Sequence, residues 1–407
     1  MSDPQPRCSL PEGVGPATLG VRGGQQRTEF GEVAEPLFLT QGYAYERAAD
    51  AEAAFAGDLD IFTYSRYSNP TVAAFEERMR LLEGAEACYA TASGMSALFA
   101  AIAPLVKSGG RVVAGRALFG STFVVLEEIL GQWGVRTDYV DAHRLEDWER
   151  ALATPADVVL FETPSNPMMD LVDIAAVSEL AHRAGALVVV DNVFATPVLQ
   201  RPLEFGADLI VYSATKHIDG QGRVMGGAVL GSREIICGPV QTFIRNTGPT
   251  LSPFNAWVLL KGLETLALRV RAQSAASLEL ATWLQGRADI ASVRYPFLDS
   301  HTQRALAAEQ MSGGGTVVSF DLAVGGDADL VKERTFAFLD ALQIIDRSNN
   351  LGDVKSMVTH PGTTTHRKLG AEGQAAIGVS PATVRLSVGL EDVPDLQADL
   401  DQALRAS

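Results

Sequence analysis

Cysteine is scarce in this chain: only Cys8, Cys88 and Cys237 occur among 407 residues. Three cysteines without a paired spacing provide neither a disulfide framework nor a cysteine metal site, so we expect a reducing compartment. The first residues are polar and contain no apolar segment of the kind found in signal peptides. No apolar run approaches the roughly 20 residues that a membrane-spanning helix needs. These shortages predict a cytoplasmic protein that does not enter a membrane.

Positive charge is also in short supply. Lysine and arginine number 33 against 49 aspartates and glutamates, which gives a net charge of −16. This surplus of negative charge argues against nucleic acid and against an anionic membrane as partners. An anionic small molecule would need a local positive site built against the overall field. The 47% of hydrophobic residues and 20% of charged residues are typical of a globular protein with a large core.

Short apolar runs alternate with amphipathic stretches, a pattern that predicts an α/β fold. We expect strands over residues 87–90, 111–114, 137–140, 158–162, 187–190, 209–212 and 228–230. We expect helices over residues 122–133, 145–152 and 174–184, and one that Thr71 caps and Gly84 ends. Such alternation is typical of a mostly parallel sheet with helices on both faces. Ligands of these sheets lie at the carboxyl ends of the strands.

The chain is expected to divide into three segments. Residues 1–62 lack a core of their own, but aromatic and apolar side chains recur along them. We prefer an arm that packs on a neighbouring subunit over a disordered tail. Residues 63–256 contain the predicted sheet. One long helix over 256–287 leads into a smaller α+β unit within 257–407, which ends with a strand at 383–388 and a helix.

A lysine follows a buried strand in the stretch 211–217, Val-Tyr-Ser-Ala-Thr-Lys-His. Burying an ammonium group is costly unless the group is paired or neutralised, and a Schiff base between Lys216 and an aldehyde would neutralise it. Ser213 and Thr215 precede the lysine and are suited to donate hydroxyl groups to a phosphate. The alternative is an ordinary junction whose lysine extends to solvent.

The turn at Ser93-Gly94-Met95 lies between a short strand and a helix of small residues. Free backbone N–H groups and the helix dipole make such a helix start favourable for an anion. A simple helix cap explains the same residues, and this alternative stays open.

Two charged residues on predicted strands need partners. Asp191 follows five apolar residues, and a protonated pyridine nitrogen would satisfy it, as would a helix cap or an arginine. Arg385 alternates with apolar neighbours, so it is either a surface residue or a bidentate clamp for a carboxylate. His360 and His366 lie in one loop, but no carboxylate or cysteine completes a metal site, so we expect no metal.

Together these residues resemble a known family. In chain order the sequence has Tyr64-x-Arg66, Ser93-Gly94-Met95, an aromatic residue at 119, Asn166, Asp191, Ser213-x-Thr215-Lys216 and a late Arg385. This order is similar to that of the Cys/Met-metabolism family of pyridoxal-phosphate enzymes, and the motif at 213–220 is its most specific part. The resemblance covers about residues 18–405 and implies an aspartate-aminotransferase-like fold. Within the family, residues 219–223 and 350–353 look most like O-succinylhomoserine sulfhydrylases.

The resemblance implies a role for each matching residue. Lys216 would bind pyridoxal 5'-phosphate covalently and move protons, while Asp191 would keep the ring nitrogen protonated. The other implied contacts are Ser93, Gly94, Met95, Ser213 and Thr215 to the phosphate, Phe119 and Asn166 to the ring, and Arg385 and Asn350 to the substrate. Tyr64 and Arg66 would reach the phosphate of a neighbouring subunit, which implies shared active sites in a homotetramer built from dimers. Tyr64 would also be available for acid–base work.

The implied activity is replacement of the γ-substituent of an O-acylhomoserine, with succinyl preferred over acetyl, by sulfide to give homocysteine in methionine biosynthesis. Where many relatives carry a tyrosine, this chain has Phe119, so acid–base work at the γ-carbon would fall on Lys216, Tyr64 or water. Arg223 or Arg116 is a candidate for the extra carboxylate of succinate. Cystathionine γ-synthase, cystathionine γ-lyase, methionine γ-lyase and a non-catalytic cofactor-binding subunit are the alternatives.

Overall fold

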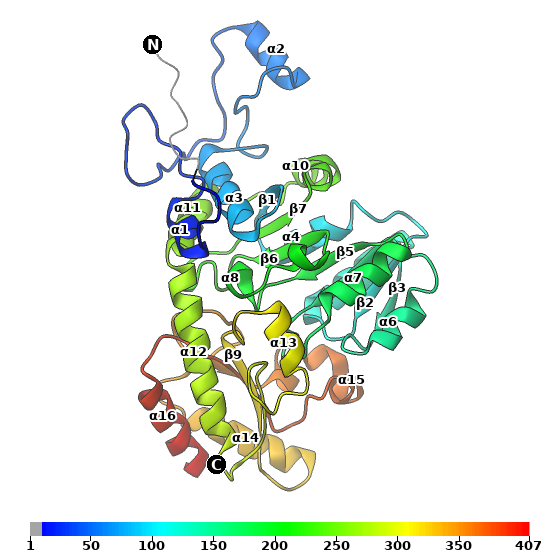
Figure 1. Ribbon diagram of the computed structural model, residues 1–407, viewed down its shortest axis with the longest axis vertical. Helices are drawn as coiled ribbons and strands as arrows, with labels where there is room; N and C mark the ends of the chain where they lie inside the picture. The colour runs from blue at the N-terminus through cyan, green and yellow to red at the C-terminus, as the bar shows by residue number, and fades with distance from the viewer. Residues whose placement is uncertain (1–9, 407) are drawn as a thin grey trace.

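The computed structural model describes residues 10–406, and a seven-stranded sheet forms its upper half (Figure 1). The strand order is β1-β7-β6-β5-β4-β2-β3, and β7 alone runs antiparallel to its neighbours. The strands are β1 (Ala87–Thr91), β2 (Arg111–Gly115), β3 (Arg136–Val140), β4 (Val158–Glu162), β5 (Leu187–Asp191), β6 (Leu209–Ser213) and β7 (Gly227–Gly231). The predicted mostly parallel α/β sheet is confirmed.

Each face of this sheet is buried under its own set of helices. In β4, Val159 and Phe161 pack into one apolar cluster, whereas Val158 and Leu160 pack into the other, as strand alternation requires. The first cluster includes side chains from α3 (Pro70–Glu83), α7 (Ile174–Arg183) and α11 (Pro253–Glu264). The second includes side chains from α4 (Gly94–Ile102) and α10 (Gln241–Thr247). Because helices cover both faces of the sheet, a ligand can reach it at the ends of the strands.

The lower half of the molecule contains a five-stranded sheet of order β10-β11-β12-β9-β8 (Figure 1). Its strands are β8 (Ile290–Arg294), β9 (Val317–Leu322), β10 (Asp346–Arg347), β11 (Met357–Thr359) and β12 (Thr383–Ser387). An apolar cluster packs one face against α12 (Leu266–Gln285), α14 (Ala328–Ala341) and α16 (Val393–Ala406). Short helices complete the chain: α1 (Pro16–Arg22), α2 (Ala48–Ala56), α5 (Gly120–Phe123), α6 (Leu145–Ala151), α8 (Thr196–Leu199), α9 (Arg233–Ile235), α13 (Arg304–Gln310) and α15 (Gly370–Ala376).

Three local predictions differ from the structure. The helix expected over 256–287 is two helices, α11 and α12, which break at Thr265. The helix α3 is capped by Asn69, whose side chain accepts the N–H of Thr71, so the predicted cap Thr71 is wrong by two residues. The segment expected as one amphipathic helix over 122–133 changes from α5 to a π-helix and then to a 3₁₀ turn. Apolar spacing alone does not distinguish these helix types.

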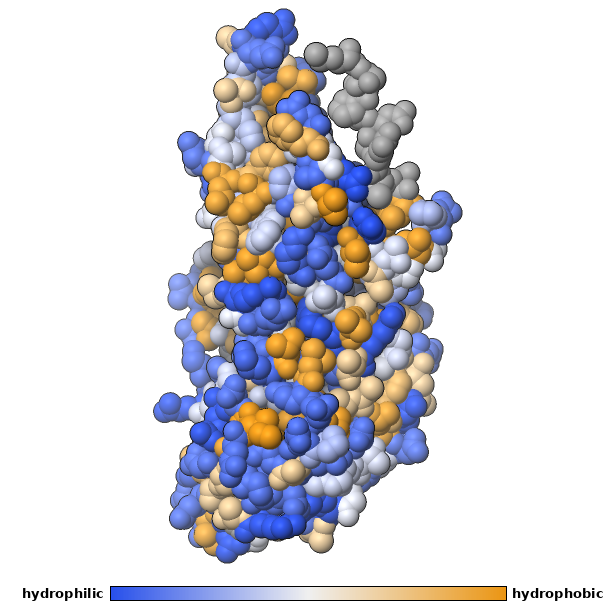
Figure 2. Space-filling model, turned by 90° about the vertical axis from the view of Figure 1, so that its left-hand side faces the viewer, coloured by the Kyte–Doolittle hydropathy of each residue, from blue (hydrophilic) through white to orange (hydrophobic). Residues whose placement is uncertain are grey.

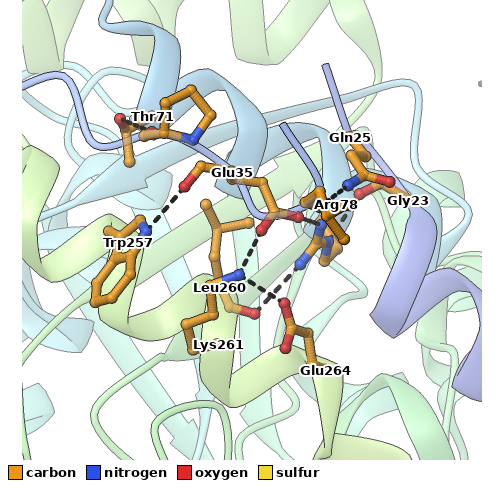
Figure 3. A network of polar contacts seen from close by, with 11 residues as sticks. Gly23, Gln25, Glu35, Thr71, Arg78, Trp257, Leu260, Lys261 and Glu264 are labelled. Atoms are coloured by element: carbon orange, nitrogen blue, oxygen red, sulfur yellow. Dashed lines mark hydrogen bonds and ion pairs between the residues drawn. The ribbon is translucent and has the colours of Figure 1, made fainter. Parts of the chain in front are cut away.

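The predicted N-terminal arm, residues 1–62, is anchored to the body of the molecule by an ionic cluster (Figure 3). Its residues 1–9 lie outside the described part. Glu35 of the arm forms ion pairs with Arg78 of α3 and Lys261 of α11, and the Arg78 side chain is 0% exposed. Trp257 donates its indole N–H to the backbone carbonyl of Glu35 at 3.0 Å. These contacts hold the arm at Glu35 against α3 and α11 of its own chain.

Among residues 10–406, no helix combines the length and the apolar character needed to cross a membrane.

Candidate active site

A cavity of about 220 Å³ lies where β4, β5 and β6 end, between the two sheets. Most of the predicted site residues meet there. The cavity is lined by the predicted residues Ser93, Gly94, Met95, Phe119, Asn166, Asp191, Ser213, Thr215, Lys216 and Arg385. The expectation that a ligand site forms at the carboxyl ends of the strands thus matches the position of the cavity.

Lys216 contributes an amine to this cavity. Its Nζ donates a hydrogen bond to Oδ1 of Asn350, which comes from the loop after β10. Burial, together with the positive charge of Arg385, lowers the pKa of Lys216 to about 8. A lysine with this pKa loses its proton near neutral pH far more readily than a surface lysine, as a nucleophile or general base must.

The start of α4 forms one wall of the cavity. Ser93 caps the helix by accepting the N–H of Ser96 at 3.1 Å. Gly94 packs so closely on β6 that a Cβ atom there would lie 2.5 Å from the Cβ of Ser213. The hydroxyl-bearing residues Ser213 and Thr215 line the cavity beside this helix start. Free helix N–H groups and nearby hydroxyls make a setting for a phosphate-sized anion.

Two carboxyl groups line the opposite part of the cavity. Asp191 ends β5, and Glu162 ends β4 directly beside it in the register of the two strands. Burial raises the pKa of Asp191 to about 6, although the N–H of Val193 donates to its Oδ1 at 3.1 Å. Burial and the charge of Asp191 raise the pKa of Glu162 well above its ordinary value. Among the described residues neither carboxylate forms an ion pair, so the cavity is suited to a cationic ligand group here.

Arg385 closes the cavity from the second sheet. Its side chain points away from Val384 and Leu386, which lie in the apolar cluster, as strand alternation predicts. The guanidinium donates to Oδ1 of Asn166 at 3.1 Å and to the carbonyl of Asn349 at 2.9 Å. Burial lowers its pKa to about 10, so it stays cationic at neutral pH. Its Nε atom has no hydrogen-bond partner within the described chain, which leaves a donor for an incoming carboxylate.

Two predicted residues, Tyr64 and Arg66, do not line this cavity. They lie just after the arm, where the guanidinium of Arg66 sits over the rings of Tyr64 and Tyr67 and donates to the carbonyl of Arg245. Tyr64 is 39% exposed. Within one chain these side chains belong to the surface.

The loop histidines lie close to the cavity but are bound to protein groups. His366 Nε2 contacts the carbonyl of Asn166 at 3.1 Å, and burial lowers its pKa to about 4. His360 bonds to Thr363 and to the carbonyl of Pro381. In residues 10–406 no group of three histidine, cysteine, aspartate or glutamate side chains is arranged to hold a metal ion.

Sequence reasoning assigned no role to Glu162 or to the loop residues Asn349 and Thr365, which also line the cavity. For Glu162 a signal was present, because it is a carboxylate at the end of a wholly apolar strand. The two loop residues carry no comparable signal.

The chain was compared with known proteins. A model of the family described as Cys/Met metabolism PLP-dependent enzyme matches residues 17–405. An O-succinylhomoserine sulfhydrylase of Mycobacterium tuberculosis is 60% identical over 396 residues, which are 97% of each chain. One from Pseudomonas aeruginosa is 49% identical, over 97% of this chain and 96% of the relative. A crystal structure of a putative O-acetylhomoserine (thiol)-lyase from Campylobacter jejuni, which contains a pyridoxyl-lysine monophosphate, matches with a TM-score of 0.91 and 30% identity over 96% of this chain and 100% of that one.

Proposed function

Because this chain belongs to the Cys/Met-metabolism family of pyridoxal-phosphate-dependent enzymes, we propose that it converts O-succinyl-L-homoserine and sulfide into L-homocysteine and succinate. The observation that carries this choice within the family is the identity of 60% and 49% to two O-succinylhomoserine sulfhydrylases over almost the whole chain. The reaction belongs to methionine biosynthesis, and we propose the cytoplasm as its location.

The residues around the cavity fit pyridoxal 5'-phosphate. The start of α4, with Gly94 held against Ser213, would hold the phosphate, and Asp191 would face the cationic ring nitrogen. Phe119 would pack on the ring, and Lys216 would bind the aldehyde. When bound, the cofactor supplies an electron sink for bonds broken at the substrate α-carbon.

The chain's own groups would then position the amino acid and move its protons. Arg385 would bind the α-carboxylate through its free Nε–H while Asn166 and Asn349 keep the guanidinium in place. Lys216 Nζ, with its lowered pKa, is the group suited to take a proton from carbon and return it. Since Phe119 has no phenol, the remaining protein candidate for acid–base work is Tyr64 of a neighbouring copy.

A second cavity of about 730 Å³ adjoins the first and gives room for the acyl chain. Phe119, Asn349 and Thr365 line both cavities. The two arginines considered from the sequence lie elsewhere: Arg223 is paired with the buried Asp219, and Arg116 lines a different cavity. Lys368 lines the adjoining cavity and forms no hydrogen bond or ion pair within residues 10–406. We therefore propose that Lys368, and neither of the two arginines, is the cation that binds the succinyl carboxylate.

We further propose that four copies assemble from dimers with shared active sites. Tyr64 and Arg66 cannot serve their own cavity from the positions described above. Apolar side chains are concentrated in the upper part of the surface in Figure 2, where the arm lies. The exposed large apolar residues in the described part of the arm are Val21, Phe30, Val33, Leu39, Phe55, Leu59 and Ile61. If sites are shared, mixing Arg66→Ala with Lys216→Ala chains will restore activity that neither variant has alone.

The proposed reaction is tested by the products that purified enzyme forms from O-succinyl- and O-acetylhomoserine, each with sulfide or with cysteine. We expect homocysteine from the succinyl donor with sulfide to form fastest. Faster formation of cystathionine would assign the chain as a cystathionine γ-synthase, and formation of a 2-oxo acid with ammonia would assign it as a γ-lyase. Sulfhydrylation that continues unchanged in Lys216→Ala would overturn catalysis through this lysine.

A further inference from the structure

The sequence-based roles leave one buried acid of the cavity without a task. Glu162 is 6% exposed and is the final residue of β4, opposite Asp191 in the parallel register of β4 and β5. Paired residues on neighbouring parallel strands lie about 4.8 Å apart and point to the same face of the sheet. Two carboxyl groups therefore share one end of the cavity, with Glu162 buried and Asp191 partly buried.

In the part of the chain that the structure describes, no lysine, arginine or histidine forms an ion pair with either acid. The nearest positive groups of the cavity are Lys216 and Arg385, and both are bound elsewhere, to Asn350 and Asn166 respectively. Two carboxylates in such a place cannot both remain ionised without a large cost, because like charges repel strongly where water is excluded. The pair is expected to keep one proton at neutral pH.

Glu162 also holds the backbone at Phe119. The N–H of Phe119 donates to Oε1 of Glu162 at 2.6 Å, and Phe119 is the residue directly before α5. The ring of Phe119 lines the cavity from this anchored position. The side chain of Glu162 thus lies next to Asp191 and also holds the backbone of Phe119, whose ring lines the cavity.

We propose that Glu162 is a protonated positioning residue, which leaves the negative charge of the pair on Asp191 and holds Phe119 against the face of the cofactor ring. Each acid accepts a backbone N–H, Asp191 from Val193 and Glu162 from Phe119, so hydrogen bonding does not decide between them. Asp191 keeps the charge because it lies where a cationic ring nitrogen is expected. The raised pKa of Glu162, caused by burial and by the charge of Asp191, agrees with this order of ionisation. The inference rests on the cofactor binding in the proposed function and does not depend on the acyl donor.

The role predicts that shape and hydrogen bonding at position 162 matter, and that negative charge there does not. A glutamine keeps the length of the side chain and the acceptor for the Phe119 N–H, and it is neutral like the protonated acid. An alanine removes the acceptor and leaves a buried N–H without a partner. Loss of such a partner at a binding wall costs roughly tenfold or more in affinity.

The experiment compares wild type with Glu162→Gln and Glu162→Ala, loaded with pyridoxal 5'-phosphate. Three quantities are measured: the dissociation constant of the cofactor, the circular dichroism of its visible band, and the infrared C=O band of a protonated carboxyl group. We expect Glu162→Gln to keep the dissociation constant within about threefold and to keep the dichroism, but to lose the infrared band. Glu162→Ala should release the cofactor at least tenfold more readily and alter the dichroism.

Equal weakening by both substitutions, or a carboxyl band that persists in Glu162→Gln, would overturn the proposal. If Glu162→Ala does not fold, the glutamine variant and its infrared band still decide the protonation state and the need for charge. Wild-type protein that binds no pyridoxal 5'-phosphate would refute the proposed function itself. Wild-type protein that binds it but forms no homocysteine would refute only the proposed reaction, and the inference about Glu162 would stand.

Discussion

Replacing Glu35 by glutamine should release the N-terminal arm from the body of the protein. Burial by itself would raise the pKa of Glu35, but the hydrogen bonds from Lys261 and Arg78 prevail and lower it to about 2. A fall from the ordinary 4.5 to about 2 corresponds to roughly 3 kcal/mol of stabilisation of the ionised form. Removing the charge also leaves the buried guanidinium of Arg78 unpaired, a change that costs about 3–5 kcal/mol in other buried pairs. A loss of a few kcal/mol is therefore expected.

The assay is thermal unfolding combined with limited trypsin digestion. For 407 residues, a loss of about 3 kcal/mol corresponds to a decrease in Tm of roughly 3–4 °C. Digestion should become faster within residues 23–47, because Glu35 anchors this segment through the contacts of Figure 3. The matched control is Glu179→Gln, which removes an exposed ion pair with Arg183 and should cost less than about 1 kcal/mol.

The effect of Glu35→Gln should also depend on pH in a defined direction. Since the folded pKa lies below the unfolded one, the stabilisation by Glu35 is complete above about pH 4.5 and is lost as the pH falls toward 2. The difference in Tm between wild type and variant should therefore shrink below pH 4.5. A variant that matches both wild type and Glu179→Gln at pH 7, in Tm and in digestion rate, would refute this reasoning.

Two further predictions concern the cavity and the smaller sheet. Gly94→Ala should lower cofactor affinity at least tenfold, because the added Cβ would lie 2.5 Å from the Cβ of Ser213. Equilibrium dialysis measures this affinity. An unchanged affinity would show that the start of α4 can move to make room for the methyl group. Asp399→Ala should destabilise the C-terminal unit by about 2–3 kcal/mol, because this carboxylate accepts the N–H groups of Gln343, Ile344 and Ile345. Hydrogen exchange of these three amides should become faster in the variant. The control variant Asp340→Ala, which removes an exposed acid, should leave their exchange rates unchanged.

The parts of the fold predicted well are those that depend on local pattern. The seven strands of the large sheet were predicted to within one residue at each end. Apolar runs located the inner strands, because buried strands are apolar throughout. The edge strand β3 was also predicted, although it is half-exposed and polar. The strand β8 and the short strands β10 and β11 were missed. Half-exposed residues such as Ser292 and Arg294 in β8 give no apolar run, and β10 and β11 contain only two and three residues. The break at Thr265 was missed because the residues on both sides of it favour a helix and have apolar side chains at helical spacing.

In the candidate site, too, the residues that depend on local sequence pattern were predicted, and those that depend on distant parts or on another copy were not. Lys216, Asp191 and Ser213 were predicted from the sequence because they lie at or just after the ends of two apolar strands, β5 and β6, so the chemistry is visible within a few residues of sequence. Whether Tyr64 lies near a cavity depends on a neighbouring copy, and its role stays a prediction. The cap at Asn69 could have been identified locally, since asparagine before proline is a strong helix start and the proline occupies the first helical position.

Glu162 shows why the electrostatics of this site could not be derived from sequence. Its proximity to Asp191 exists only because β4 and β5 pair in parallel with the two acids opposite each other; a shift of one residue would turn one of them to the other face of the sheet. The charge state of each acid then depends on the other and on the absence of a cation, which no single stretch of sequence specifies. A sequence motif thus predicts which acid would meet the cofactor, while the register of two strands determines which second acid lies beside it.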